Sequence, residues 1–443
     1  MPLVLKEKYR ELCGGTLMAA GLLLPLIYIP AFNDFFYRTD GHYMPKAIFL
    51  VYMGLITAVT YGLGRLGEGR VRREGFLAGS GIAVLIMALW VFLSSAFSPY
   101  QELVWIGRGF RFEGFLTLMA YLTFAYVGAR TLTIRQVEKL LNLMLAVSVL
   151  LALYGLIQYL GFELLPRDMH REDRVRVAYA TFGNRNFTGS YSVLMTCLFI
   201  LQYIRLGLRR YLGGAMLLFS LLMASMTRGA WLGFLGASLL MLPVYRVHLH
   251  EKKKRIISVL LALILVFSLM SLDPYFRDRV LTFSGELDRL SSGDPEEMGM
   301  VGSNRGLIYL GTIPLLDDSL LLGSGPDTFG EVFDQDWYDS FTQKDDIIVD
   351  KAHNEYLNMW VTLGLPFLLA YLVFVGFHLR GVRKRDDALG YVLHYGVLGY
   401  LLQAVFNISV VTVAPLYWIL LGMYGAVIRV GRDSDDSKPG ITG

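Results

Sequence analysis

Arginines at the ends of apolar segments are the first residues whose type and position suggest chemistry. Arg228, in the sequence SMTRGAW, lies in a turn too short to carry its side chain far into water. Arg176 and Arg185 lie in a polar segment directly before another apolar run. A guanidinium is always charged and forms forked hydrogen bonds to phosphate oxygens. We therefore expect these three arginines to bind a lipid phosphate or diphosphate rather than only to reach toward headgroups.

The same polar segment contains arginines for which a simpler role is favoured. Arg167, Arg171 and Arg174 alternate with acidic residues, so we expect them to pair with those acids. The sequence GRGFRFEG adds two more, of which Arg111 is a candidate supporting residue.

A histidine at the start of an apolar run is the candidate base. His353 and Asn354 stand in the sequence DKAHNEYL, directly after the only long polar segment of the chain. A neutral imidazole held at the start of a helix can take a proton from a hydroxyl near neutral pH. A helix-capping or interfacial histidine is the alternative interpretation.

The long segment from residue 273 to 352 predicts a small extracytoplasmic domain. It has 17 acidic and 6 basic residues, hence a net charge of −11. The spacing of Leu307, Ile308, Leu310 and Ile313 predicts a short amphipathic helix lying on the membrane, with Asn304 and Arg305 at its start. Long loops in compact proteins usually serve as lids or binding elements.

We expect neither a cofactor nor a metal ion. Cys13 and Cys197 are far apart inside apolar runs, which supports neither a disulfide framework nor a cysteine-based metal site. Acidic residues of the long segment could bind a divalent cation, but a calcium-loop pattern is absent; they are Asp334, Asp336, Asp345 and Asp346.

Composition places all of these residues in a membrane protein. The 443 residues are 54% hydrophobic and 18% charged, which excludes a water-soluble protein, and the net charge of +4 does not indicate a nucleic-acid partner. The sequence predicts an all-α polytopic fold with about twelve transmembrane helices. The apolar runs are 13–32, 44–64, 76–97, 113–129, 138–160, 187–204, 211–227, 229–247, 256–272, 354–378, 389–407 and 411–428.

Basic residues predict the orientation of these spans. With both termini in the cytoplasm, 25 of the 41 Lys and Arg residues fall in cytoplasmic segments, as the positive-inside rule requires. We expect helices one to nine within 1–272, the extracytoplasmic domain at 273–352, helices ten to twelve within 353–430, and a disordered cytoplasmic tail at 431–443. No removable signal peptide is predicted.

Four short motifs in order resemble a known family. They are Gly-Asn-x-Asn-Phe at 183–187, Thr-Arg-Gly-Ala-Trp at 227–231, Asn304-Arg305 followed by an apolar helix and a glycine-rich turn ending at Phe329, and His-Asn-x-Tyr-Leu at 353–357. With this span number and one large outer loop, the sequence resembles the O-antigen ligase and O-antigen polymerase superfamily over residues 180–378.

The resemblance implies a GT-C-like glycosyltransferase of the bacterial inner membrane. Such enzymes transfer a glycan from undecaprenyl diphosphate to a hydroxyl of a glycolipid, a glycan or a protein, by an inverting reaction that needs no metal. It also implies that His353 is the base and that Arg228 and Arg305 hold the donor diphosphate. Arg185 replaces a proline common in the family. Possible supporting residues are Asn184, Asn186, Asn304, Asn354 and Arg111.

Alternatives to an O-antigen ligase remain open in the sequence. A polymerase would need the same donor site and the same base, so one sequence does not separate the two. A transporter or flippase of lipid-linked sugars is less favoured, because transporters carry polar groups at the middle of the bilayer. Here the charges lie at the outer edge of the spans.

Overall fold

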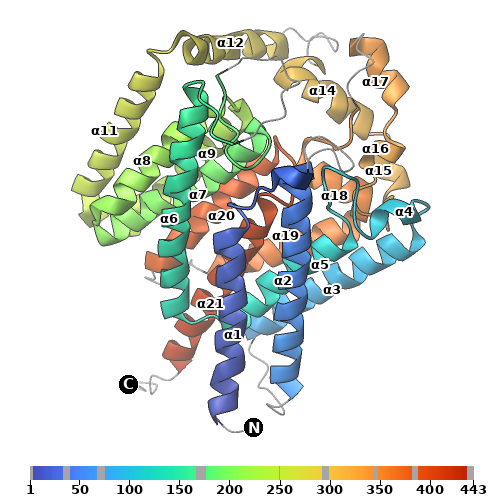
Figure 1. The fold of residues 1–443 in the computed structure, drawn as a ribbon, viewed down its shortest axis with the longest axis vertical. Coiled ribbons are helices and arrows are strands. Elements are labelled where there is room, and N and C mark those ends of the chain that lie inside the picture. Colours follow the sequence, from blue (N-terminus) through green and yellow to red (C-terminus); the bar gives the residue numbers. More distant parts are fainter. Residues whose placement is uncertain are drawn as a thin grey trace.

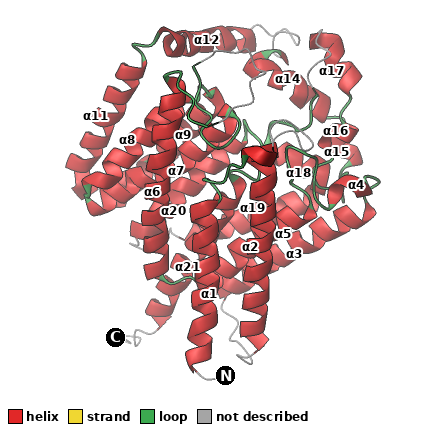
Figure 2. Ribbon diagram, in the orientation of Figure 1, coloured by secondary structure: helices red, strands yellow, loops and turns green. Residues whose placement is uncertain are grey.

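The described residues of the protein fold entirely into helices and loops (Figure 2). The computed structural model describes residues 3–32, 40–66, 75–165, 176–248, 250–291, 299–342, 348–381 and 388–436. The first half of the chain forms α1 (Leu3–Leu23), α2 (Asp40–Leu66), α3 (Gly75–Phe97), α4 (Gln101–Val104), α5 (Phe115–Thr131), α6 (Ile134–Tyr159), α7 (Arg185–Leu206), α8 (Arg209–Ala224), α9 (Arg228–Leu240) and α10 (Leu242–His248).

The second half continues with one bent pair, several short helices and a closing bundle. It forms α11 (Lys253–Met270), α12 (Pro274–Ser291), α14 (Val301–Thr312), α15 (Leu315–Asp318), α16 (Phe329–Val332), α17 (Gln335–Thr342), α18 (Glu355–Leu363), α19 (Leu365–Gly381), α20 (Ala388–Ala404) and α21 (Ala414–Asp436). Short 3₁₀ turns at Pro30–Phe32 and His250–Lys252 complete the described elements.

Helix α7 is the centre of the bundle. Every residue from Phe187 to Ile204 is buried, whereas α2 and α3 expose much of their surface. A helix buried on all sides is typical of the core of a large helical protein. Because α7 begins with Arg185, the buried core leads directly to one of the predicted phosphate-binding residues.

Close packing of α5 against α21 stabilises a second part of the bundle. A side chain at Gly128 would lie 3.0 Å from the Cα atom of Gly422, so the two backbones meet without intervening side chains. Small residues at such crossings let membrane helices approach closely.

Part of the segment between α11 and α19 forms a layer at one end of the molecule. Helices α12, α14 and α17 lie at the end opposite to the first residues of α1 and the last residues of α21 (Figure 1). Helix α12 is bent by 107° against α11 and runs across this end. Part of the layer has its own apolar cluster, which includes Leu307, Phe329, Phe333, Tyr338 and Val349.

The helical fold is confirmed, whereas the number of membrane spans is not. Each of the twelve apolar runs contains a helix, but among the described residues five helices are long and apolar enough to cross a membrane, or six if the bent pair α11 and α12 forms one span. Two predicted spans are interrupted: 229–247 breaks at Met241, and 354–378 breaks at Gly364, whose positive φ of 83° ends α18.

Two finer predictions differ from the structure, and a third is found as a helix. Span four begins at Phe115 and not at residue 113, so Glu113 lies in the preceding loop. Residues 431–436 continue α21 instead of belonging to a disordered tail, because the helix extends into its charged end. The predicted amphipathic helix exists as α14, with Leu307 and Ile308 buried in the small cluster and Leu310 and Ile313 exposed.

Candidate functional site

The turn from Met226 to Gly229, directly before α9, is the point at which the predicted arginines meet. Arg185 and Arg228 each begin a helix, α7 and α9. The hydroxyl of Thr227 donates to the carbonyl of Arg185 at 3.1 Å, which joins the two helix starts. Free N–H groups and the helix dipole make such starts favourable for anions.

Arg305 reaches the same turn from α14. Its Nη1 donates a hydrogen bond to the carbonyl of Phe406, and a side chain at Gly229 would lie 3.3 Å from that nitrogen. Burial, followed by the charges of Arg185 and Arg228, lowers the pKa of Arg305. A guanidinium stays protonated nevertheless, so three positive charges are held close together.

Among the described residues, these positive charges exceed the neighbouring negative charge. Arg228 pairs with Glu286 of α12, with 2.5 Å between Nη2 and Oε1. The guanidinium of Arg185 has no hydrogen-bond partner within the described part of the chain. Arg279 of α12 is also close enough to be repelled by Arg228, Arg185 and Arg305. The site therefore has donors and positive charge available for a multiply charged anion.

Arg279 and Glu286 were not predicted from the sequence. The signal available for Arg279 was a basic residue inside a segment that is strongly acidic. Nothing in the sequence distinguishes Glu286 from the other acidic residues of that segment.

His353 lies beside this arginine group, in the loop before α18. Its backbone has a positive φ of 51°, and its carbonyl lies 3.1 Å from the hydroxyl of Tyr309, which can donate to it. Its Nδ1 is buried and has no partner among the described residues. Burial and then the charge of Arg305 lower the pKa of His353 from 6.5 to about 3. The imidazole is therefore neutral at neutral pH, and its Nδ1 can accept a hydrogen bond from a hydroxyl group.

The supporting asparagines have local structural roles. Asn354, and not His353, caps α18, because its side chain accepts hydrogen bonds from the N–H groups of Tyr356 at 3.0 Å and Leu357 at 3.1 Å. Asn184 caps α7 in the same way, through the N–H of Asn186 at 2.8 Å.

The other two asparagines lie close to the arginines. The carbonyl of Asn186 accepts a hydrogen bond from Asn407 at 2.9 Å. Asn304 has a positive φ of 68° within α14, directly before Arg305. An asparagine tolerates this backbone conformation better than most residues do.

Arg111 is not part of the arginine group but holds the loop that carries His353. Its Nε and Nη2 bind the two oxygens of Asp350 at 2.5 Å and 3.0 Å. Its guanidinium also lies 5.9 Å from the ring centre of Phe187 in α7. Arg111 is therefore neutralised by a protein carboxylate and positions its neighbours.

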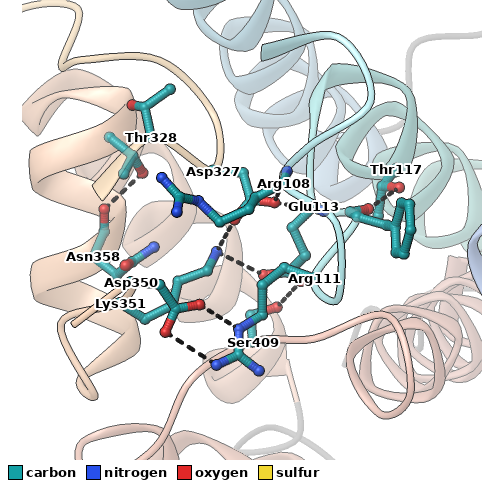
Figure 3. A network of polar contacts seen from close by, with 12 residues as sticks. Arg108, Arg111, Glu113, Thr117, Asp327, Thr328, Asp350, Lys351, Asn358 and Ser409 are labelled. Atoms are coloured by element: carbon teal, nitrogen blue, oxygen red, sulfur yellow. Dashed lines mark hydrogen bonds and ion pairs between the residues drawn. The ribbon is translucent and has the colours of Figure 1, made fainter. Parts of the chain in front are cut away.

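A buried ion network continues from this pair (Figure 3). Lys351 lies 2.8 Å from Asp327 and 3.3 Å from Glu113. Asp327 accepts hydrogen bonds from the backbone N–H of Arg108 at 2.8 Å and of Glu113 at 3.2 Å. The network joins the loop before α5, the glycine-rich turn before α16 and the segment leading to His353. The sequence analysis assigned no role to Lys351, Glu113 or Asp327.

Two sets of predicted residues lie elsewhere. Arg176 is exposed and lies near Tyr159, which bonds Asp273. It is therefore not part of the arginine group. Arg167, Arg171, Arg174, Asp345 and Asp346 lie outside the described residues. Among the described residues, no group of three His, Cys, Asp or Glu side chains is arranged to hold a metal ion.

Comparison with known families finds one match. Residues 213–372 match the family model described as O-antigen ligase. This match covers a little over a third of the chain and supports the resemblance to the O-antigen ligase and polymerase superfamily. The matched region contains Arg228, Arg279, Arg305 and His353, and it ends before α20. No curated protein matches the chain.

Proposed function

We propose that the protein is a membrane glycosyltransferase of the O-antigen ligase type. It transfers a glycan from undecaprenyl diphosphate to a hydroxyl of a lipid A core or of another cell-surface acceptor. The observation that carries this proposal is the neutral His353 beside an arginine group with more donors than protein partners.

The arginines act on the leaving group. When the bond between the sugar C1 and the diphosphate oxygen breaks, both electrons of that bond remain on the oxygen. Arg185, Arg228 and Arg305, together with the starts of α7 and α9, stabilise the added negative charge. These groups are fixed before the reaction begins, so little reorganisation is needed.

His353 acts on the acceptor. Its neutral imidazole takes the proton of the acceptor hydroxyl while the oxygen forms a bond to C1 from the face opposite to the diphosphate. This single displacement inverts the configuration at C1. The histidine holds the proton as an imidazolium, and the departing diphosphate keeps the electron pair of the broken C1–O bond. The step therefore requires no oxidant or cofactor.

The reaction is assigned to the outer face of a bacterial cytoplasmic membrane. The arginine group is formed largely by the starts of α7, α9, α12 and α14, at the end of the molecule opposite to the start of α1 and the end of α21 (Figure 1). We assign both termini to the cytoplasm from the distribution of basic residues, and on that assignment the site faces the outside, where it meets lipid-linked glycans.

Transfer by purified protein tests the proposal. Wild type and the variants His353→Asn and Arg228→Gln receive a glycan linked to undecaprenyl diphosphate, with a chelator present, and then candidate acceptors. Asparagine is chosen because it tolerates the positive φ at position 353. We expect His353→Asn to reduce turnover by about 10²- to 10⁴-fold while donor binding persists. We expect Arg228→Gln to reduce both.

The products distinguish the related functions. One added glycan block supports a ligase, whereas a ladder of repeats supports a polymerase of the same superfamily. Full transfer by His353→Asn would exclude this histidine as the base. Movement of the donor across reconstituted vesicles without transfer would instead support a transporter.

A further inference from the structure

Helix α12 brings two opposite charges to the arginine group. Arg279 directs its side chain at the turn before α9, because its Nε donates to the carbonyl of Met226 at 3.2 Å. Its terminal amino groups have no hydrogen-bond partner within the described ranges. Arg228, Arg185 and Arg305 all repel it, and Glu286 attracts it. A bound anion would remove this repulsion.

Glu286 is bound in the way in which proteins bind a phosphate. One carboxylate oxygen lies 2.5 Å from Nη2 of Arg228. The other accepts a hydrogen bond at 3.0 Å from the backbone N–H of Gly302, in the first turn of α14. An arginine and an N–H group at a helix start are the usual donors to a phosphate oxygen.

We propose that Arg279 is a fourth ligand of the donor diphosphate and that Glu286 is an internal anion which the diphosphate displaces. This inference rests on the proposed function and assigns both roles to one helix. In the free protein, Glu286 neutralises one of the four arginines. When the donor enters, a phosphate takes the place of the Glu286 carboxylate and uses the unoccupied donors of Arg185 and Arg279.

The two roles predict effects of opposite sign. Arg279→Gln removes an attractive charge and should weaken diphosphate binding by about tenfold. Glu286→Gln removes a competing anion but can still accept the hydrogen bond from Gly302. It should strengthen diphosphate binding by about three- to tenfold.

The experiment is calorimetric titration of the full-length protein in detergent with farnesyl diphosphate, with a chelator present and with farnesol as the uncharged control. Helix α12 supplies matched control variants, because Arg277 and Asp278 are exposed neighbours of Arg279. Arg277→Gln and Asp278→Asn make the same charge changes as the two test variants. Both controls should bind farnesyl diphosphate as wild type does.

Thermal unfolding separates binding from a structural role. If Arg279 only supported the carbonyl of Met226, Arg279→Gln would lower the unfolding midpoint of the free protein. If Arg279 instead binds phosphate and is repelled by three arginines in the free protein, Arg279→Gln should leave the unfolding midpoint of the free protein unchanged or raise it. Farnesyl diphosphate should then raise the midpoint of this variant less than it raises that of wild type. Arg279→Lys, which keeps the charge, should recover most of that rise.

The outcomes distinguish this inference from the proposed function. If Arg228→Gln weakens binding but Arg279→Gln binds as its control does, the fourth ligand is excluded and the transferase stands. If Glu286→Gln fails to bind more tightly, the internal anion is excluded. If wild type does not bind farnesyl diphosphate, both this inference and the donor site fail.

Discussion

Arg111 and Asp350, 239 positions apart in the sequence, form a two-pronged ion pair three residues before His353. Both side chains are largely buried, with exposed fractions of 14% and 7%. The pair fixes the loop of the candidate base to the loop before α5. Burial alone would raise the pKa of the Asp350 carboxyl. The positive charge and the hydrogen bonds of Arg111 stabilise the carboxylate and lower that pKa instead.

Arg111→Lys should therefore reduce kcat by about tenfold while the KM for the donor changes little. Lysine keeps the charge but not the two parallel hydrogen bonds, so the position of His353 becomes less defined. Steady-state transfer at saturating acceptor measures the effect. Arg108→Lys is the matched control, since the pair of Arg108 with Glu331 is more exposed. An equal loss in both variants would contradict a specific positioning role.

The lowered pKa of His353 predicts an unusual pH profile. An ordinary histidine, with a pKa of about 6.5, would lose about 90% of its neutral form at pH 5.5. In the folded protein the neutral form persists to lower pH. We expect kcat/KM to stay nearly constant between pH 7.5 and 5.5, because both phosphates of the donor are substituted and do not titrate there. Half-maximal activity near pH 6.5 would contradict the buried, neutral base.

The same lowered pKa makes folding depend on acidity. Because the unfolded histidine binds a proton at higher pH than the folded one, the protein loses stability as pH falls below about 6.5. His353→Asn should reduce this loss. Unfolding midpoints of wild type and variant at pH 7.5 and 5 measure the difference, which should be larger for wild type.

Lys351 should be critical for stability. Burial alone would lower its pKa, but Asp327 and Glu113 raise it, so the residue is charged and paired. Lys351→Met leaves two buried carboxylates without a cation and should destabilise the protein by about 3–5 kcal/mol. Unfolding in a denaturing detergent measures the change. Lys351→Met combined with Glu113→Gln should recover part of the loss, and equal stabilities of the single and double variants would contradict this account.

The two asparagine caps should affect different kinetic constants. Asn354→Ala and Asn184→Ala each remove a helix cap worth about 1 kcal/mol. Asn354 adjoins the candidate base, so its loss should lower kcat, whereas Asn184 adjoins Arg185, so its loss should raise the KM for the donor. Aspartate in place of either residue keeps the cap and serves as the control. Identical kinetic changes in both alanine variants would contradict separate roles.

The helices themselves were predictable from the sequence because hydropathy is a local property. Every apolar run contains a helix, since a backbone in an apolar environment must satisfy its hydrogen bonds within its own segment. The polar ends of these runs also located Arg228 and His353, and the start of the predicted amphipathic helix located Arg305. Interruptions such as Gly364 were not predicted, because an apolar run is continuous in sequence whether or not its helix is.

The convergence of the site was decided only by the tertiary structure. Arg277 and Arg279 look alike in the sequence, but two residues rotate a helix by about 200°, so only one of them faces the turn before α9. Arg176 and Arg185 likewise differ only in where the fold places them. The pairing of Arg111 with Asp350 depends on contacts between distant segments, which the order of residues along the chain does not specify. Which charges meet is therefore a property of the packed helices and not of the local sequence.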